Sequence, residues 1–500
     1  STTRSYLQGA EVIRMLQTLL CKDTFRKGFD LYIARNDGHA VTCEAFLEAM
    51  EEASGRDLQQ FRRWYSQAGT PRVAVSTQWN AEAGQLVMTV EQTTPPTPGQ
   101  PAKEPMLMPF PVALLDAEGR EMPVLLEGES EGSAQLTRMF ELKDARQTWV
   151  FSGLREKPVP SLNRGFAAPV ILDVSLDADA LALLARADSD PFNRWEAMNR
   201  LMMKAILEQV RAVLANDQTP VNATLLEAFG ALIDDVNLSP AFRAVAMELP
   251  SERAVPAAIH RAREIVREAL GIRWHSKLVS VIDGCRLEGE YSPDSTSAGI
   301  RALKNTCYYY GVAAGNKTMV LRVRDQFNTA NNLTDRLAAL NMIAGSSTPT
   351  KNDTIVSALK EWYSEPLLVN KWLTIQATAP CFAGEAPVVT RVSELANSPF
   401  FSMENPNNVY ALLVAFFMNN PAEFHRLDGE GYKFWVECVL KLDALNPQVA
   451  SRVARSLENW RRYTPQLSNL MFQALKHLER QEKLSVSVRE IVEKALNNPA

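Results

Sequence analysis

The sequence of 500 residues lacks the short motifs that mark most catalytic centres. It contains no HExxH zinc motif, no phosphate-binding P-loop, no GxGxxG fingerprint after a strand and no GxSxG nucleophile elbow. Histidines with the three- to five-residue spacing of zinc ligands on one helix are also missing. The five histidines are too scattered for that; they are His39, His260, His275, His425 and His477. The residues alone therefore show no complete active site and no metal site.

Long apolar runs and an excess of positive charge are missing as well. The longest apolar run extends from Val409 to Met418, whereas a membrane-spanning helix needs about 20 residues. Lys and Arg total 53 against 58 Asp and Glu, which gives a net charge of −5. Non-specific nucleic-acid binding requires a basic surface. We therefore expect neither a membrane nor a nucleic acid as a partner.

Cysteine is scarce, and no two cysteines have a CxxC spacing; the six are Cys21, Cys43, Cys285, Cys307, Cys381 and Cys438. Most of them stand beside apolar residues, so we expect buried free thiols in the cytoplasm or another reducing compartment. A disulfide pair or a cysteine nucleophile is the alternative. The N-terminus lacks an initiator Met and an apolar signal core, so we interpret the chain as part of a larger protein.

What is present is an ordinary globular composition, with 46% hydrophobic and 22% charged residues and the length of about three domains. Residues 1–70 have a helical period. In Gly9–Leu20 the apolar side chains fall on one face, and further helices are expected near Asp23–Ala34, after Thr42 and near Leu58–Gln67. This first segment is therefore predicted to be a helical stub.

The period of the pattern changes at Pro71, where alternating apolar and polar residues begin. About seven short strands within residues 71–174 predict a small β-sandwich. The strand candidates are Arg72–Ser76, Gln85–Glu91, Phe110–Leu115, Pro123–Leu126, Gln135–Leu142, Thr148–Phe151 and Pro169–Val174.

Residues 175–500 read as consecutive helices with short polar gaps, such as Asp190–Ala215 and Asn408–Phe417. Such a series favours stacked helix pairs, although no repeat of fixed period is present. The predicted fold class is α+β multidomain and mainly α. It comprises the helical stub (1–70), the β-sandwich (71–174) and a large α-helical, solenoid-like superhelical domain (175–500).

Several local strings have counterparts in one enzyme family. Tyr6–Met15, which reads Tyr-Leu-Gln-Gly-Ala-Glu-Val-Ile-Arg-Met, resembles the Tyr-x-x-Gly-Ala-x-Val segment of the zinc aminopeptidases of the aminopeptidase N (alanyl aminopeptidase) family. Asp57–Pro71 is similar to the end of that family's catalytic domain. Three further stretches resemble its helical C-terminal domain: 330–335, 371–378 and 446–452. The resemblance covers essentially the whole chain.

The resemblance implies that this chain is the C-terminal portion of such an enzyme and that residues 1–70 end its thermolysin-like catalytic domain. The family binds zinc through HExxH and a downstream Glu, and a Gly-Ala-Met-Glu-Asn loop binds the substrate amine. None of these is in this chain. Zinc is therefore expected in the parent enzyme and not here, and the chain alone is expected to be inactive.

Three residues take positions to which the resemblance assigns a role. Tyr6 matches the catalytic tyrosine, whose hydroxyl stabilises the oxyanion of the tetrahedral intermediate. Gln8 departs from the pattern, because the family commonly has Lys there. Arg452 matches an arginine near the substrate, and Tyr410 stands where such enzymes carry a second Arg. Without the resemblance, Tyr6 would be a terminal aromatic residue and Arg452 a solvated helix residue.

Two function classes follow. The first is a fragment of a zinc aminopeptidase that removes N-terminal residues from peptides, with the helical domain walling the substrate chamber and the rest of the same protein as its partner. The second is a non-catalytic helical scaffold whose concave face binds a protein partner. An HExxH motif upstream of Ser1 would favour the first class.

Overall fold

The computed structural model describes residues 2–250, 257–287 and 289–497. Its contacts divide the chain into two compact units, residues 1–201 and 202–500. Within the described residues, every strand lies in the first unit, and the second unit consists of helices and the segments that connect them. The predicted fold class is confirmed: the chain is mainly helical and carries one small β-sandwich. The boundaries near residues 70 and 174 stay predictions.

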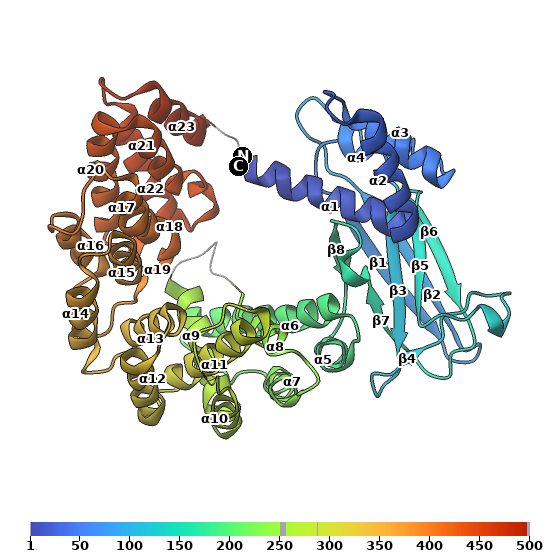
Figure 1. Cartoon of the computed structure of the whole chain (residues 1–500), viewed down its shortest axis with the longest axis horizontal. Helices are drawn as coiled ribbons and strands as arrows, with labels where there is room; N and C mark the ends of the chain where they lie inside the picture. The colour runs from blue at the N-terminus through green and yellow to red at the C-terminus, as the bar shows by residue number, and fades with distance from the viewer. Residues whose placement is uncertain (1, 251–256, 288, 498–500) are drawn as a thin grey trace. The chain divides into compact units, whose positions relative to one another are not determined.

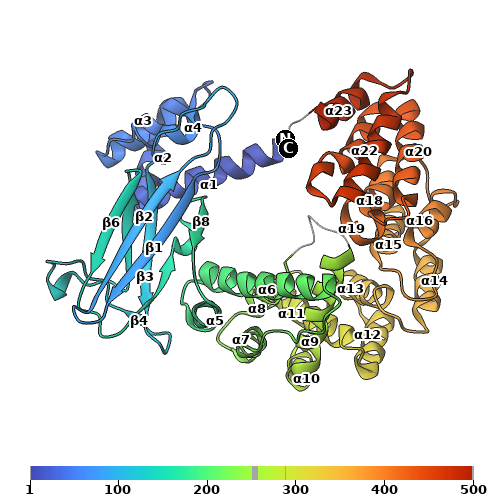
Figure 2. The same ribbon diagram turned by 180° about the vertical axis from the view of Figure 1, so that it is seen from behind.

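The first unit begins with the helices α1 (Thr2–Leu20), α2 (Lys22–Asn36), α3 (Cys43–Ser54) and α4 (Arg63–Ser66), which lie together at one end of the strands (Figures 1 and 2). Leu16, Leu47 and Phe61 are fully buried in one core with the sandwich. The helix expected over 58–67 is shorter than predicted. The Asp57 carboxylate accepts the Gln59 N–H, and this local turn competes with a helix.

The sandwich has two sheets of four strands each. One sheet has the order β6-β2-β1-β8, and in the other β3 pairs with β4, β5 and β7. β3 is buried along its whole length, whereas β1 and β2 alternate between buried and exposed residues. The strands are β1 (Arg72–Asn80), β2 (Gln85–Thr93), β3 (Met108–Leu115), β4 (Glu121–Met122), β5 (Thr137–Leu142), β6 (Arg146–Phe151), β7 (Val159–Leu162) and β8 (Ile171–Val174).

Two strand predictions need correction. Pro123–Leu126 is not a strand, because only Val124 and Leu126 form single bridges, to Gln135 and Phe151. Strand β7 (Val159–Leu162) was not predicted, because it contains a proline and prolines disfavour the interior of a strand. Pro160 is accommodated there because β7 pairs only with β3 and keeps its other edge unpaired within the described residues.

The remaining helices follow one another, and those of the second unit lie along a curved path (Figures 1 and 2). Many begin at a side-chain cap: Asn222, Ser239, Asp294, Asn316 and Asn446 each accept a backbone N–H of the first turn. The helices are α5 (Ala178–Ala187), α6 (Pro191–Leu214), α7 (Ala223–Asp234), α8 (Pro240–Ala246), α9 (Ala257–Arg273), α10 (His275–Gly284), α11 (Ser295–Ala313), α12 (Lys317–Thr329), α13 (Leu333–Ala344), α14 (Lys351–Trp362), α15 (Pro366–Thr378), α16 (Val388–Ala396), α17 (Pro406–Val409), α18 (Ala415–Asn419), α19 (Pro421–Phe424), α20 (Glu430–Leu445), α21 (Pro447–Ala454), α22 (Pro465–Glu479) and α23 (Val486–Asn497).

All six cysteines are free thiols. Cys307 and Cys438 are buried, and burial raises the pKa of each thiol to about 12, so both are inert at neutral pH. The expectation of burial is wrong for Cys21 and Cys43, which are exposed. Among the described residues, no helix is both long enough and apolar enough to cross a bilayer.

Candidate functional site

The backbone of Tyr6 belongs to α1, and its side chain lies outside the described residues. The same helix is anchored two turns later by Arg14. The guanidinium of Arg14 donates to the Gly165 carbonyl at 2.8 Å and to the Phe166 carbonyl, and it also pairs with Glu11. Helix α1 is therefore fixed to the loop that follows β7.

That loop has a strained backbone. Asn163 and Phe166 have φ values of 50° and 52°, and Gly165, between them, has a φ of 66°. A bulky residue rarely adopts a positive φ, so surrounding contacts must hold Phe166 in place. The hydrogen bond from Arg14 and the Asn163 amide, which pairs with both the N–H and the carbonyl of Ala168, supply such contacts.

Arg164 joins the same loop to the segment between α5 and α6. Its side chain is 7% exposed, and Nη2 donates to Glu121 at 2.7 Å, to Asp188 at 3.0 Å and to Ser189 at 2.6 Å. The Asp188 side chain is fully buried, and this burial raises the pKa of its carboxyl. No sequence motif indicated this network, because the partners of Arg164 lie 24 to 43 residues away along the chain.

Arg452 and Tyr410 are brought together by the structure. Arg452, in the last turn of α21, donates from Nη1 to the Tyr410 hydroxyl at 2.7 Å, and its guanidinium lies 5.6 Å from the centre of the Tyr410 ring. Arg452 is exposed and Tyr410 half-buried. The tyrosine therefore orients the exposed cation and leaves its other N–H groups available to a ligand.

Tyr410 also begins an irregular turn. The single helix predicted over Asn408–Phe417 is interrupted by η3 (Tyr410–Val414), a π-helical turn between α17 and α18. The Thr374 hydroxyl of α15 donates to the Ala411 carbonyl at 3.0 Å and gives this turn an additional hydrogen bond. Such π-helical turns recur at functional sites, which supports a ligand-binding role for this position.

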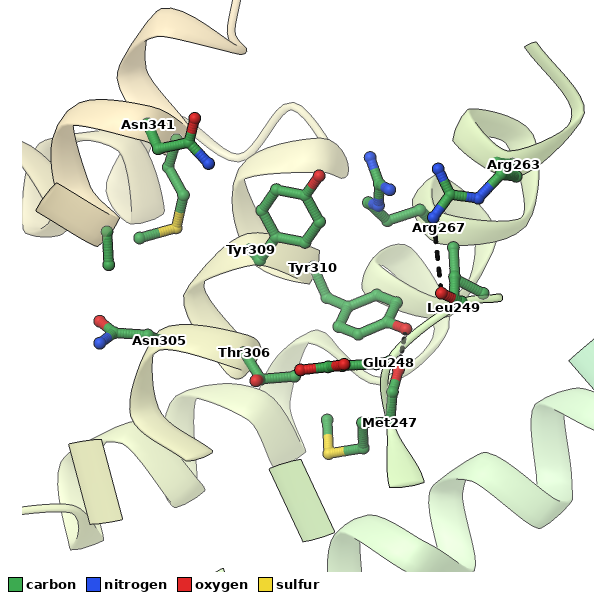
Figure 3. Close-up of a pocket in the computed structure, with 12 residues that line it drawn as sticks. Met247, Glu248, Leu249, Arg263, Arg267, Asn305, Thr306, Tyr309, Tyr310 and Asn341 are labelled. Atoms are coloured by element: carbon green, nitrogen blue, oxygen red, sulfur yellow. Dashed lines mark hydrogen bonds between the residues drawn. The ribbon is translucent and has the colours of Figure 1, made fainter. Parts of the chain in front are cut away.

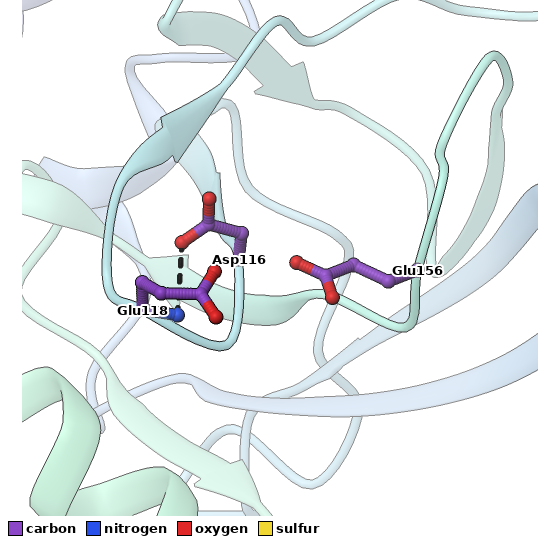
Figure 4. A group of neighbouring side chains, drawn as sticks. All are labelled: Asp116, Glu118 and Glu156. Carbon is purple, nitrogen blue, oxygen red and sulfur yellow. Dashed lines mark hydrogen bonds between the residues drawn. The ribbon is translucent and has the colours of Figure 1, made fainter.

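Among the described residues, one group of carboxylates could hold a metal ion: Asp116, Glu118 and Glu156, whose ligand atoms lie within 4.8 Å of one another (Figure 4). Although burial opposes it, hydrogen bonds from the N–H and the guanidinium of Arg120 lower the pKa of Asp116. Both oxygens of Asp116 thus already stabilise a turn, which explains the group without an ion. Three carboxylates also differ from the histidine-rich ligands of a catalytic zinc site.

Comparisons with known families match three consecutive stretches. Residues 2–65 match the peptidase family M1 domain. Residues 69–175 match a domain of unknown function (DUF3458) with an Ig-like fold, and residues 178–497 match a domain of unknown function (DUF3458_C) with ARM repeats.

Individual relatives are similar along nearly the whole chain. Aminopeptidase N of Escherichia coli is 35% identical over 99% of this chain, and aminopeptidase N of Caulobacter vibrioides is 38% identical over 99%. A crystal structure of Legionella pneumophila aminopeptidase A in complex with aspartic acid matches 97% of the chain with a TM-score of 0.81 and 25% identity. The chain spans 57%, 56% and 56% of these proteins, a little over half of each.

Proposed function

The chain belongs to the aminopeptidase N family of M1 peptidases, and on that premise we propose that it is the C-terminal portion of a zinc-dependent aminopeptidase that removes N-terminal residues from peptides. The observation that carries the proposal is the similarity to aminopeptidase N over 99% of the chain. The parent enzyme would act in the cytoplasm or another reducing compartment, which six free thiols support.

In this proposal Tyr6 supplies a hydrogen bond to the oxyanion that forms when a peptide carbonyl is attacked. A neutral phenol suits the role, because it stabilises the developing negative charge without giving up its proton. Arg452, oriented by Tyr410, binds the C-terminal side of the peptide, since its guanidinium is always charged and presents several donors to carboxylates and carbonyls. The helical domain walls the substrate chamber and excludes water from it.

The described residues do not fit a catalytic zinc ion, so no step of the reaction is assigned to a metal in this chain. No pair of histidines is spaced as zinc ligands are, and His425, for example, is buried with Nδ1 hydrogen-bonded to the Tyr432 hydroxyl at 3.0 Å. Zinc would be held by the rest of the parent enzyme.

The proposal is tested by comparing this chain with the intact parent protein. We expect the chain alone to retain no stoichiometric zinc after dialysis and to cleave no alanyl or leucyl anilide. The intact parent should hold zinc and cleave both reporters. A parent protein without zinc and without activity would favour the scaffold function. If this chain alone binds zinc and cleaves the anilides, the expectation that it is inactive without an HExxH motif is wrong.

Arg452→Ala in the intact parent should raise KM for short peptides by about tenfold and leave kcat nearly unchanged. The contact is made in the ground state and the transition state alike, so its loss weakens binding only. An anilide reporter without a nearby carboxylate should be affected less. Arg455→Ala is the matched control, because Arg455 is an exposed neighbour whose ion pair, with Glu458 at 3.6 Å, lies on the surface. Equal effects on peptide and reporter would make Arg452 a solvated surface residue.

A further inference from the structure

Helix α1 enters the core of the first unit with its second half. Met15 is fully buried there, and Val12 packs against the same core from a partly buried position. Gly9 and Ala10, which precede them, are exposed. Arg14 lies at the border between the two halves, so its contacts bear on the direction in which the first turns of the helix leave the core.

Arg14 reaches from this border to the sandwich with two donors. Nη1 donates to the Gly165 carbonyl at 2.8 Å, Nη2 donates to the Phe166 carbonyl, and the guanidinium carbon lies 5.7 Å from the centre of the Phe166 ring. Glu11, in the preceding turn of α1, accepts a hydrogen bond from Nε at 2.9 Å and orients the guanidinium. A planar group with two bonded donors fixes both distance and direction, which a single point contact does not.

The turn that receives Arg14 is itself restrained. Phe166 is held at a positive φ of 52°, and Arg164 pairs with the fully buried carboxylate of Asp188 at 3.0 Å. Asn163 is 3% exposed, and its amide bonds to the backbone within the same turn. Such a backbone persists only where its surroundings hold it in place. Arg14 is therefore bonded to a fixed point of the sandwich and not to a loop that would follow the helix.

The place of Tyr6 is sensitive to this anchor because a helix behaves as a lever. Tyr6 lies about 12 Å before Arg14 along the axis of α1, at the usual rise of about 1.5 Å per residue. A tilt of about 5° at Arg14 would displace the backbone of Tyr6 by about 1 Å, and a misplacement of this size can cost about a hundredfold in rate. A small change at the anchor is thus enlarged at the position of the oxyanion donor.

We propose that Arg14 is a positioning residue for the Tyr6 hydroxyl. By bonding to the Gly165 and Phe166 carbonyls, it sets the direction of α1 and with it the place of the oxyanion donor. The inference rests on the proposed function, because it takes Tyr6 to be that donor. Arg14 itself contacts neither the substrate nor the reacting atoms, since its donors are directed to Glu11 and to the two backbone carbonyls.

Steady-state kinetics of the intact parent on an alanyl anilide test this role. Arg14→Gln should lower kcat by about tenfold and leave KM nearly unchanged, because a misplaced donor weakens an interaction that is made only in the transition state. Arg14→Lys should lose less, since one ammonium group can still bond to one of the two carbonyls. A change in KM alone, or no change in either constant, would overturn the proposal.

A double-variant cycle with Tyr6→Phe distinguishes positioning from a general loss of structure. If Arg14 acts through the Tyr6 hydroxyl, Arg14→Gln should have no further effect on kcat once that hydroxyl is absent. If the two single losses multiply in the double variant, Arg14 does not position Tyr6 and the inference is wrong. If Tyr6→Phe alone leaves kcat unchanged, the proposed role of Tyr6 fails first and this inference fails with it.

Two control variants separate stability from positioning. Tyr310→Phe removes another bond from a side chain to a distant backbone carbonyl: in the second unit, the Tyr310 hydroxyl donates to the Met247 carbonyl at the wall of a pocket (Figure 3). This variant should lower the melting temperature and leave kcat unchanged. Arg26→Gln removes an exposed arginine of α2 that pairs with Asp30 at 2.8 Å, and it should alter neither quantity. A loss of kcat that follows the melting temperature in all three variants would make Arg14 a stabilising contact only.

Discussion

Tyr6→Phe in the intact parent enzyme should lower kcat by about 10²–10³, the usual loss for one oxyanion donor, and leave KM nearly unchanged. Phenylalanine keeps the ring and removes only the hydroxyl, so the variant tests the hydrogen-bond donor alone. The hydrogen bond strengthens as charge develops on the carbonyl oxygen, and its loss therefore raises the barrier without weakening substrate binding. Steady-state kinetics on an alanyl anilide measure both constants.

A matched control is Tyr32→Phe. Tyr32 lies on α2 of the same unit, and its ring packs edge-on against Phe46 with the ring centres 5.3 Å apart. Its hydroxyl has no proposed role, so the substitution should leave kcat unchanged. If Tyr6→Phe behaves like this control, Tyr6 is a packing residue and the oxyanion donor must be sought elsewhere in the parent.

Arg14 anchors the helix to which Tyr6 belongs, through a contact that the sequence did not suggest. The side chain connects α1 to the carbonyls of Gly165 and Phe166, about 150 residues further along the chain. Sequence patterns describe neighbours along one element, whereas this contact depends on how the sandwich folds back to the first helix. The matching strings could indicate the role of Tyr6, but not what holds its helix.

The fold itself was predictable where one periodicity persisted over many residues. The change at Pro71 from a helical to an alternating pattern marks the start of β1 at Arg72. Local exceptions were not predictable. The apolar pattern around Tyr410 fits a continuous helix as well as it fits the π-helical turn that is present. Strand β7 was not predicted because it contains Pro160, which a sheet tolerates only at an edge, and the sequence does not show which strands lie at an edge.

The candidate site shows the same limit. Tyr410 stands where the family resemblance implies a second arginine, and the sequence could not say what a tyrosine does there; the structure places its hydroxyl against Arg452. His425 looks like any polar residue in the sequence. The structure buries it between aromatic rings, and this burial lowers the pKa of its imidazole to about 4. In both cases the partner lies on an element whose position the sequence leaves open.

Arg164→Met should destabilise the first unit by about 3–5 kcal/mol, the usual result of removing one partner from a buried ion pair. The substitution leaves the carboxylate of Asp188 without its positively charged partner, although this side chain is fully buried, with 0% of its surface exposed. Hydrogen exchange of the buried strand β3 should therefore accelerate by at least about a hundredfold, because these amides exchange only when the unit opens.

Two further variants distinguish the effect of breaking the buried Arg164–Asp188 pair from the effect of removing any arginine of the sandwich. Arg146→Met removes an exposed arginine of the same sandwich, 68% accessible and 3.2 Å from Glu91, and should cost less than about 1 kcal/mol. The double variant Arg164→Met, Asp188→Leu should recover part of the lost stability, since it removes the buried charge along with its partner. Equal losses for the two single arginine variants would contradict this account of Arg164.

The pH dependence of Arg164→Met gives an independent check on the sign of the effect. Burial already raises the pKa of Asp188 in the folded protein, whereas the pKa of an Asp in the unfolded chain is about 3.9. When folding raises the pKa of a group, that group stabilises the folded state at pH values below its pKa in the unfolded chain. This stabilisation is lost as the pH rises through the pKa of the folded state. Without the arginine this folded pKa moves further up, so the deficit of the variant should be largest at pH 7 and shrink as the pH falls toward 4. A deficit that does not change with pH would mean that lost packing, rather than the uncompensated carboxylate, destabilises the variant.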